Sequence, residues 1–115
     1  MPAGIGPQLR VTVNRRGEIY FNQEVFRVIG RPANVTLLFA PATMSLAIKF
    51  PVPADRHFHR VRRCGRGKKT LVVRAARMFS QFNTDISETI RLWNLRVEML
   101  GGVKMVVGEI YTRAG

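Results

Sequence analysis

The sequence has little of what a secreted or membrane-spanning protein needs. Its 115 residues include one cysteine, Cys64, so no disulfide can form within the chain, and we expect a reducing, cytoplasmic setting. No apolar run approaches the roughly 20 residues of a membrane-spanning helix. The N-terminus also lacks the charged and apolar segments of a secretory signal. The sequence therefore predicts a soluble protein without a membrane partner.

Acidic residues are scarce as well. Seven Asp and Glu stand against nineteen Lys and Arg, which gives a formal net charge of +12. Such a surplus destabilises a compact chain through self-repulsion unless a polyanion relieves it. The few carboxylates form no closely spaced catalytic pair, and Cys64, although flanked by arginines, has no identifiable general base. We therefore expect a protein that is not an enzyme, needs no cofactor and binds a polyanion.

One short segment suggests a metal site, because His57, His59 and Cys64 lie close together in the sequence. A structural zinc site takes four ligands, typically in two close pairs. This segment offers one pair and a lone thiol, and the surrounding arginines would repel a cation. We expect no bound metal, and we interpret the histidines as flanking a buried Phe58.

The apolar patterning indicates a β-hairpin, a short helix and a second hairpin, and then the same order again. Phe26 and Ile29 of the first helix recur as Phe79 and Phe82, 53 residues later. Duplication matters because one such unit, about forty residues, is too small to bury enough surface alone. The expected strands are 9–13, 19–21, 34–40, 44–50, 60–63, 70–73, 89–100 and 103–111, and the expected helices are 22–30 and 74–83.

These elements predict a single domain over residues 9–113. Within it we expect repeat one at 9–50, a proline-containing linker at 51–58 and repeat two at 59–113. Residues 1–8, rich in glycine and proline, are expected to form a flexible tail.

The segment after the second helix permits two interpretations. Asp85 and Glu88 have the spacing of a capping box, which favours a helix. Residues 89–100 also alternate in hydrophobicity, are rich in β-branched and aromatic residues, and end at a Gly-Gly turn, which favours a strand. We predict a strand. Tyr20, Trp93 and the phenylalanines could stack on single-stranded bases, but their spacing predicts core positions.

The first half resembles the AbrB/SpoVT-type swapped-hairpin DNA-binding family. The shared pattern is a strand, a turn with a basic residue and glycine, a strand, a short helix ending in Ile-Gly, and a closing hairpin. The second half, from Val61 to Tyr111, matches the pattern more loosely. The matching residues of the first half are Arg16, Gly17, Ile19, Phe21, Phe26, Ile29, Gly30, Val35, Leu37 and the strand 46–50.

The resemblance implies a mainly β fold with two short helices, namely an AbrB-like swapped-hairpin β-barrel built from two pseudo-repeats. Two copies in one chain resemble the tandem arrangement of the MraZ-type branch. Many family members regulate transcription, including antitoxins that repress their own operon, and they contact DNA through basic residues of the first hairpin. Carried over to this sequence, the DNA-binding residues are Arg10, Arg15, Arg16, Arg62, Arg63, Arg66, Lys68 and Lys69.

In a swapped barrel the two basic turns would lie side by side, so that these eight charges converge on one face that follows phosphates. We therefore expect binding to double-stranded DNA and a nucleoid-associated location. The alternatives are a non-enzymatic interaction or assembly module, antitoxin-like or phage-associated, with an acidic protein partner, and an RNA-binding protein. A homodimer is compatible with each of them.

Overall fold

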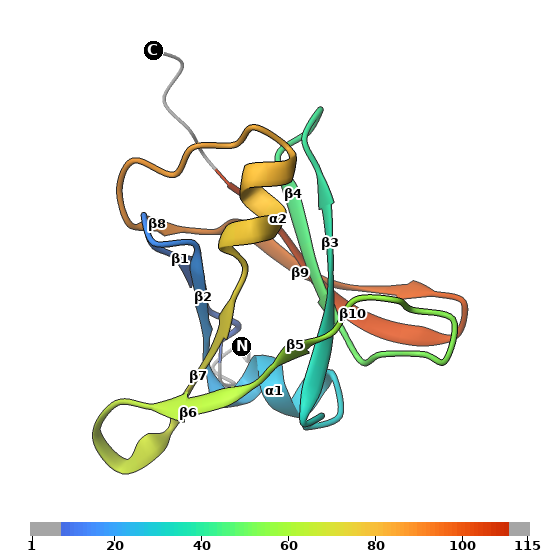
Figure 1. Cartoon of the computed structure of the whole chain (residues 1–115). Helices are drawn as coiled ribbons and strands as arrows, with labels where there is room; N and C mark the ends of the chain where they lie inside the picture. Colours follow the sequence, from blue (N-terminus) through green and yellow to red (C-terminus); the bar gives the residue numbers. More distant parts are fainter. Residues whose placement is uncertain (1–7, 111–115) are drawn as a thin grey trace, which may run out of the picture.

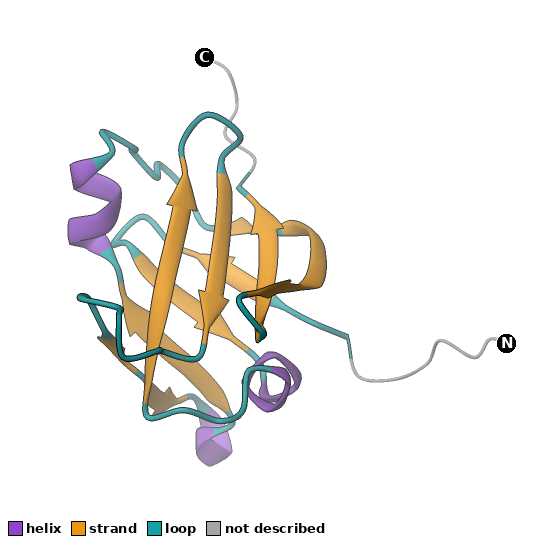
Figure 2. Ribbon diagram, turned by 90° about the vertical axis from the view of Figure 1, so that its right-hand side faces the viewer, coloured by secondary structure: helices purple, strands orange, loops and turns teal. Residues whose placement is uncertain are grey.

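The computed structural model describes residues 8–110 and has a mainly β fold with two short helices, as the sequence predicts (Figure 1). The expected tail, residues 1–8, lies outside the described residues except for Gln8, and so does Tyr111. The strands form two antiparallel five-stranded sheets, which Figure 2 shows as two layers with differently inclined strands.

The first sheet brings together the first hairpin of each half. Its strands are β1 (Val11–Val13), β2 (Glu18–Phe21), β6 (Arg62–Cys64), β7 (Thr70–Arg74) and β8 (Ile90–Arg91). The strand order is β6-β7-β2-β1-β8, so the two hairpins are neighbours through β7 and β2. A 3₁₀ turn, η1 (Arg66–Lys68), lies in the loop of the second hairpin.

The second sheet brings together the closing hairpins. Its strands are β3 (Asn34–Ala40), β4 (Ser45–Lys49), β5 (His59–Arg60), β9 (Trp93–Leu100) and β10 (Val103–Glu109). The order is β5-β3-β4-β10-β9. The segment 89–100 thus forms strands, as predicted, and Asp85 and Glu88 lie in the loop before them.

Local chemistry marks both ends of α1 and the end of α2. In α1 (Gln23–Val28) the side chain of Asn22 accepts a hydrogen bond from the Val25 amide at 3.2 Å, and Gly30 follows with a positive φ of 93°. In α2 (Ala76–Gln81) the corresponding stop is Asn83, at φ 52°. No helix within residues 8–110 is long and apolar enough to cross a bilayer.

The pairing between the halves has a central residue pair in each sheet. Tyr20 lies opposite Val72, one of the two central pairs of the β2–β7 ladder, and Ala47 lies opposite Val107 in the middle of β4–β10. A twofold axis normal to the sheet exchanges two antiparallel neighbours. An axis through each of these pairs therefore relates hairpin β1–β2 to β6–β7 and hairpin β3–β4 to β9–β10.

The sheets do not close into a barrel, so that part of the predicted fold is wrong. The chain passes from one sheet to the other three times: through α1, between β2 and β3; at Val61, between β5 and β6; and at Leu92, between β8 and β9. The flanking strands β5 and β8 each have two residues, so the crossing points supply too few ladder hydrogen bonds to join the sheets. Both sheets keep open edges.

The core lies between the sheets. It contains Val11, Val13, Ile19, Phe21, Leu71 and Val73 from the first sheet and Val35, Leu46, Ile48 and Val106 from the second, each at most 2% exposed. Because side chains alternate between the two sides of a strand, the residues between these positions face outward.

Four aromatic side chains expected in the core are exposed instead: Phe58 at 52%, Phe50 at 46%, Trp93 at 46% and Phe82 at 42%. Phe58 belongs to the linker rather than to a strand or helix. Trp93 begins the edge strand β9, beside an irregularity in the β9–β10 register. Phe82 follows the last residue of α2 and packs against Phe39, with ring centroids 5.5 Å apart.

Candidate nucleic-acid interface

The outward side of the first sheet carries polar and basic residues. Val13 of β1 and Ile19 of β2 are completely buried against the core. Their neighbours Thr12 and Tyr20 are half-buried and point to the other side. This outward side is the left-hand surface of the molecule in Figure 1.

One register row crosses this side and has an exposed arginine at each end. Across the five strands the row reads Arg62, Val72, Tyr20, Thr12 and Arg91. With about 4.8 Å between neighbouring strands, the Cα atoms of Arg62 and Arg91 lie roughly 19 Å apart.

Other arginines lie beside this row. Arg74 is opposite Glu18 in the β2–β7 ladder, and the carbonyl of Arg10 accepts a hydrogen bond from the Asn22 amide at 3.2 Å. A hollow of about 250 Å³ is lined by Arg60 together with Arg62 and Arg74. We call the outward side of the first sheet, with Arg10, Arg60, Arg62, Arg74 and Arg91, the basic face.

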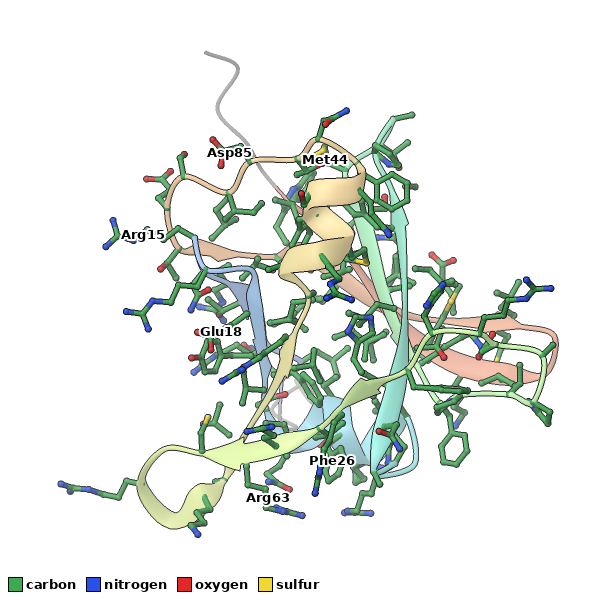
Figure 3. The ribbon with its side chains drawn as sticks, in the orientation of Figure 1. Arg15, Glu18, Phe26, Met44, Arg63 and Asp85 are labelled. Atoms are coloured by element: carbon green, nitrogen blue, oxygen red, sulfur yellow. The ribbon has the colours of Figure 1, made fainter. Side chains whose placement is uncertain are left out.

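The two basic turns lie at opposite ends of the basic face, so the expectation that they meet side by side is wrong. Strands β2 and β7 are antiparallel, with Glu18 opposite Arg74 at one end and Phe21 opposite Leu71 at the other. The turn of the first hairpin adjoins the Glu18 end and that of the second adjoins the Phe21 end. At about 3.4 Å per residue, the length of β7 separates them by roughly 17 Å. Figure 3 shows Arg15 at the upper end of the face and the second loop at its lower end.

All eight residues expected to bind DNA are exposed. Arg10 and Arg62 lie on the basic face itself. Arg63 lies on the core-facing side of β6, with its Cζ atom 5.5 Å from the centroid of the Phe26 ring, and is therefore separated from the others (Figure 3). The remaining five lie in the turns at the two ends: Arg15, Arg16, Arg66, Lys68 and Lys69.

Three arginines of the basic face are not among the residues predicted to bind DNA, because the resemblance points to the first hairpins and their turns. Arg60, Arg74 and Arg91 lie in strands. The period-two pattern of the sequence could have placed them on the outward side of their strands, because each arginine alternates with an apolar neighbour that points to the other side.

The arginines of the basic face form no ion pair with any carboxylate of residues 8–110. The ion pairs in this range join Arg27 to Glu24, Lys49 to Asp55, and Arg96 to Glu98 and Glu109. Within the described part of the chain, these arginines are therefore not held in ion pairs.

Glu18 is the acidic residue on this side. Its carboxylate accepts hydrogen bonds from the Asn14 side chain at 2.9 Å and from the Tyr20 hydroxyl at 3.2 Å. These bonds, that from Asn14 foremost, hold the pKa of Glu18 below its usual value. Burial and the neighbouring carboxylate raise the pKa of Tyr20, so its phenol stays protonated at neutral pH. The carboxylate thus serves to fix the turn and the phenol.

Of the two histidines, His57 and His59, the second has a structural role. His59 Nδ1 lies 2.8 Å from the backbone oxygen of Arg74 and thereby links β5 to β7. Within residues 8–110 no three His, Cys, Asp or Glu side chains gather closely enough to hold a metal ion.

No family model, curated protein or solved structure matches this chain.

Proposed function

We propose that this chain is a small non-enzymatic protein that holds double-stranded DNA against the basic face. The observation that carries the proposal is the pair of exposed arginines, Arg62 and Arg91, at the two ends of one register row, without carboxylate partners in the described chain. Phosphate neutralisation dominates the affinity of proteins for DNA, and arginine binds phosphate with a fixed, two-pronged geometry.

The dimensions of the row suit the major groove. That groove is about 12 Å wide and admits a two-stranded β-ribbon. In this pose the β2–β7 ribbon faces the groove, and Arg62 and Arg91, roughly 19 Å apart at their Cα atoms, reach the phosphate backbones on its two sides. Phosphate contacts set the register, whereas base edges are read by groups over the groove floor, where Arg74 and Tyr20 lie.

The proposal extends to an AbrB-like transcription regulator of the swapped-hairpin type. In its support, strand order β6-β7-β2-β1 places hairpins from the two halves next to each other, with the central Tyr20–Val72 pair between them. An approximate twofold axis normal to the basic face suits an operator with approximate twofold symmetry.

The test is a salt titration of DNA binding by fluorescence anisotropy, with a labelled duplex of about 25 base pairs, enough for two helical turns. If about six phosphates are neutralised, log K falls with log salt at a slope near −5. The variant Arg62→Ala/Arg91→Ala should make the slope of log K against log salt less negative by about 2, roughly one unit for each lost phosphate contact. It should also weaken binding at least tenfold at 0.1 M salt.

The matched control is Arg56→Ala/Arg77→Ala, which removes the same charge from exposed positions on the linker and α2. Equal weakening by the control and the test variant would mean that the chain binds as an unstructured polycation. Absence of binding to duplex DNA at low salt would reject the proposal, and tighter binding to an RNA duplex of the same sequence would redirect it to RNA.

A second candidate function, docking of an acidic protein segment, has one observation in its favour. A groove of about 700 Å³ between β3, the linker and α2 is lined by the exposed side chains of Leu38, Phe58 and Phe82, with Arg56 and Arg77 also lining it. An apolar floor with basic residues at its border suits an acidic amphipathic segment. Under this alternative, Arg56→Ala/Arg77→Ala abolishes binding of such a peptide and leaves DNA binding unchanged.

A further inference from the structure

Strand β9 is the longest strand of the fold and lies at the edge of the second sheet. It has eight residues and pairs with β10 on one side. No other strand of residues 8–110 pairs with its outer edge. Figure 1 shows the β9–β10 hairpin projecting to the right, away from the first sheet. The unpaired backbone groups of such an edge are a template for another strand.

The register irregularity of β9 lies between Trp93 and Arg96, and from Arg96 to Leu100 the strand pairs regularly with β10. In this regular part the side chains do not protect the edge. Proteins commonly discourage edge-to-edge pairing with lysine, proline or a short strand. Residues 93–100 contain neither lysine nor proline. Two apolar side chains on the same side of the strand, Val97 and Met99, are 45% and 59% exposed.

The sequence of β9 is complementary to itself in one antiparallel register. A twofold axis at Val97 places Val97 opposite Val97 of the second copy, and Leu95 opposite Met99 of the second copy. On the other side of the strand, Arg96 of each copy lies opposite Glu98 of the other copy. Directly opposed residues of opposite charge stabilise a sheet, as do opposed apolar residues.

Neighbouring registers lack this match. Directly opposite residues of an antiparallel pair point to the same side of the sheet. The twofold axis must therefore pass through a pair of identical residues and cannot lie between two neighbouring residues. An axis at Arg96 would oppose the two copies of Arg96, and an axis at Glu98 would oppose the two copies of Glu98. Like charges in direct opposition are destabilising. Of these three registers, the charges of β9 favour the one centred on Val97.

The charged side of β9 is already ordered. Arg96 Nε lies 2.6 Å from Glu98 Oε2, and Arg96 Nη1 lies 2.7 Å from Glu109 Oε2. These contacts hold the guanidinium and both carboxylates on the side of the sheet where the second copy would add its own Arg96 and Glu98. Little side-chain ordering then remains to oppose association.

We propose that a second copy of this chain binds along the outer edge of β9, antiparallel and centred on Val97. Two five-stranded sheets thereby become one continuous sheet across an isologous interface. The partner is another copy of the chain because the opposing charges and apolar residues are those of β9 itself.

The oligomeric state tests this proposal. Sedimentation velocity in 0.3 M NaCl, which screens the repulsion between two basic chains, should give a dimer of the 13.0 kDa chain. Glu98→Arg opposes arginines across the axis and should weaken dimerisation more than tenfold. The matched control Glu88→Arg makes the same charge change on the exposed loop before β8 and should dimerise as the wild type does.

Crosslinking tests the register. In a Cys64→Ser background, Val97→Cys should form a disulfide-linked dimer, because opposed Cβ atoms lie about 5 Å apart. Met99→Cys is more exposed in the chain, yet its two copies would be four residues apart along the seam, about 13 Å, and should not crosslink.

A monomeric wild type at 0.2 mM, or a dimer unaffected by Glu98→Arg, would overturn the proposal. Equal crosslinking at both cysteine positions would overturn the register. If circular dichroism shows that Glu98→Arg is unfolded, Val97→Lys replaces it, since this side chain is already 45% exposed and would oppose two lysines.

Discussion

Lys49 Nζ lies 2.8 Å from Asp55 Oδ2, and this ion pair fastens the linker across the outward side of the second sheet. Lys49 is 4% exposed, while the same carboxylate oxygen also accepts hydrogen bonds from Thr36 Oγ1 and the Val52 amide, both at 2.9 Å. The hydrogen bond from Lys49, followed by that from Val52, lowers the pKa of Asp55 from 3.8 to about 2.

The first prediction concerns acid stability. The folded-state pKa of Asp55 is depressed, so its stabilising contribution is present above the unfolded value of 3.8 and is lost as pH falls to about 2. Asp55→Asn should lower the melting temperature by several degrees at pH 6, because it leaves the buried Lys49 ammonium without its charge partner. The difference from the wild type should then shrink between pH 4 and pH 2. Asp85→Asn, on an exposed loop, is the control and should behave as the wild type does.

The second prediction concerns the first turn. Gly17 has φ +78°, and a Cβ built there would lie 2.6 Å from Cα of Ala76. Gly102 has a similar φ, +80°, with nothing within 4 Å of the added atom. Gly17→Ala should therefore destabilise the fold by about 3 kcal/mol, against about 1 kcal/mol for Gly102→Ala, which has the backbone strain alone. Chemical denaturation measures both, and equal losses would refute the steric explanation.

The third prediction concerns the core. Phe21 is 2% exposed in the centre of the first sheet, whereas Phe50, just after β4, is 46% exposed. Phe21→Ala should cost about 4 kcal/mol in the free energy of unfolding, a large part of the total of about 5–15 kcal/mol expected for a domain. Phe50→Ala should cost about 1 kcal/mol, because less apolar surface is re-exposed. Similar urea midpoints for the two variants would contradict the core assignment.

The fourth prediction concerns the first turn as a DNA contact. Arg15 and Arg16 are exposed and make no ion pair within residues 8–110. Arg15→Ala/Arg16→Ala should weaken DNA binding severalfold and change the melting temperature by less than about 2 °C, as expected for surface substitutions. Because this turn lies at one end of the basic face, the effect should be smaller than that of Arg62→Ala/Arg91→Ala. A large loss of stability would mean that the arginines are structural.

Local elements were predictable because their signals lie in adjacent residues. Asn22 and Gly30 mark the ends of α1, and the Gly-Gly turn separates β9 from β10. The side of each strand that faces the core also follows from alternation, as with Val11 and Val13.

The arrangement of the hairpins was not predictable in the same way. Whether the two turns meet or point apart depends on the ladder between β2 and β7, which joins residues such as Tyr20 and Val72 across half of the chain. No local pattern specifies that register, and antiparallel pairing sends the turns to opposite ends. For the same reason the candidate interface is formed by arginines of the strands, such as Arg74, and the basic turns lie at its two ends.

The two ladders between the halves also constrain how the chain acquires its fold. Both β2–β7 and β4–β10 join strands that are far apart in sequence, so each requires closure of a long loop before it contributes stability. A nascent first half emerging from the ribosome holds two hairpins without their central neighbours. The first sheet cannot be completed until β8 has been synthesised, and the second cannot be completed until β10 has been synthesised. Folding should therefore wait for the synthesis of β10 and be slow for a domain of this size, in milliseconds to seconds.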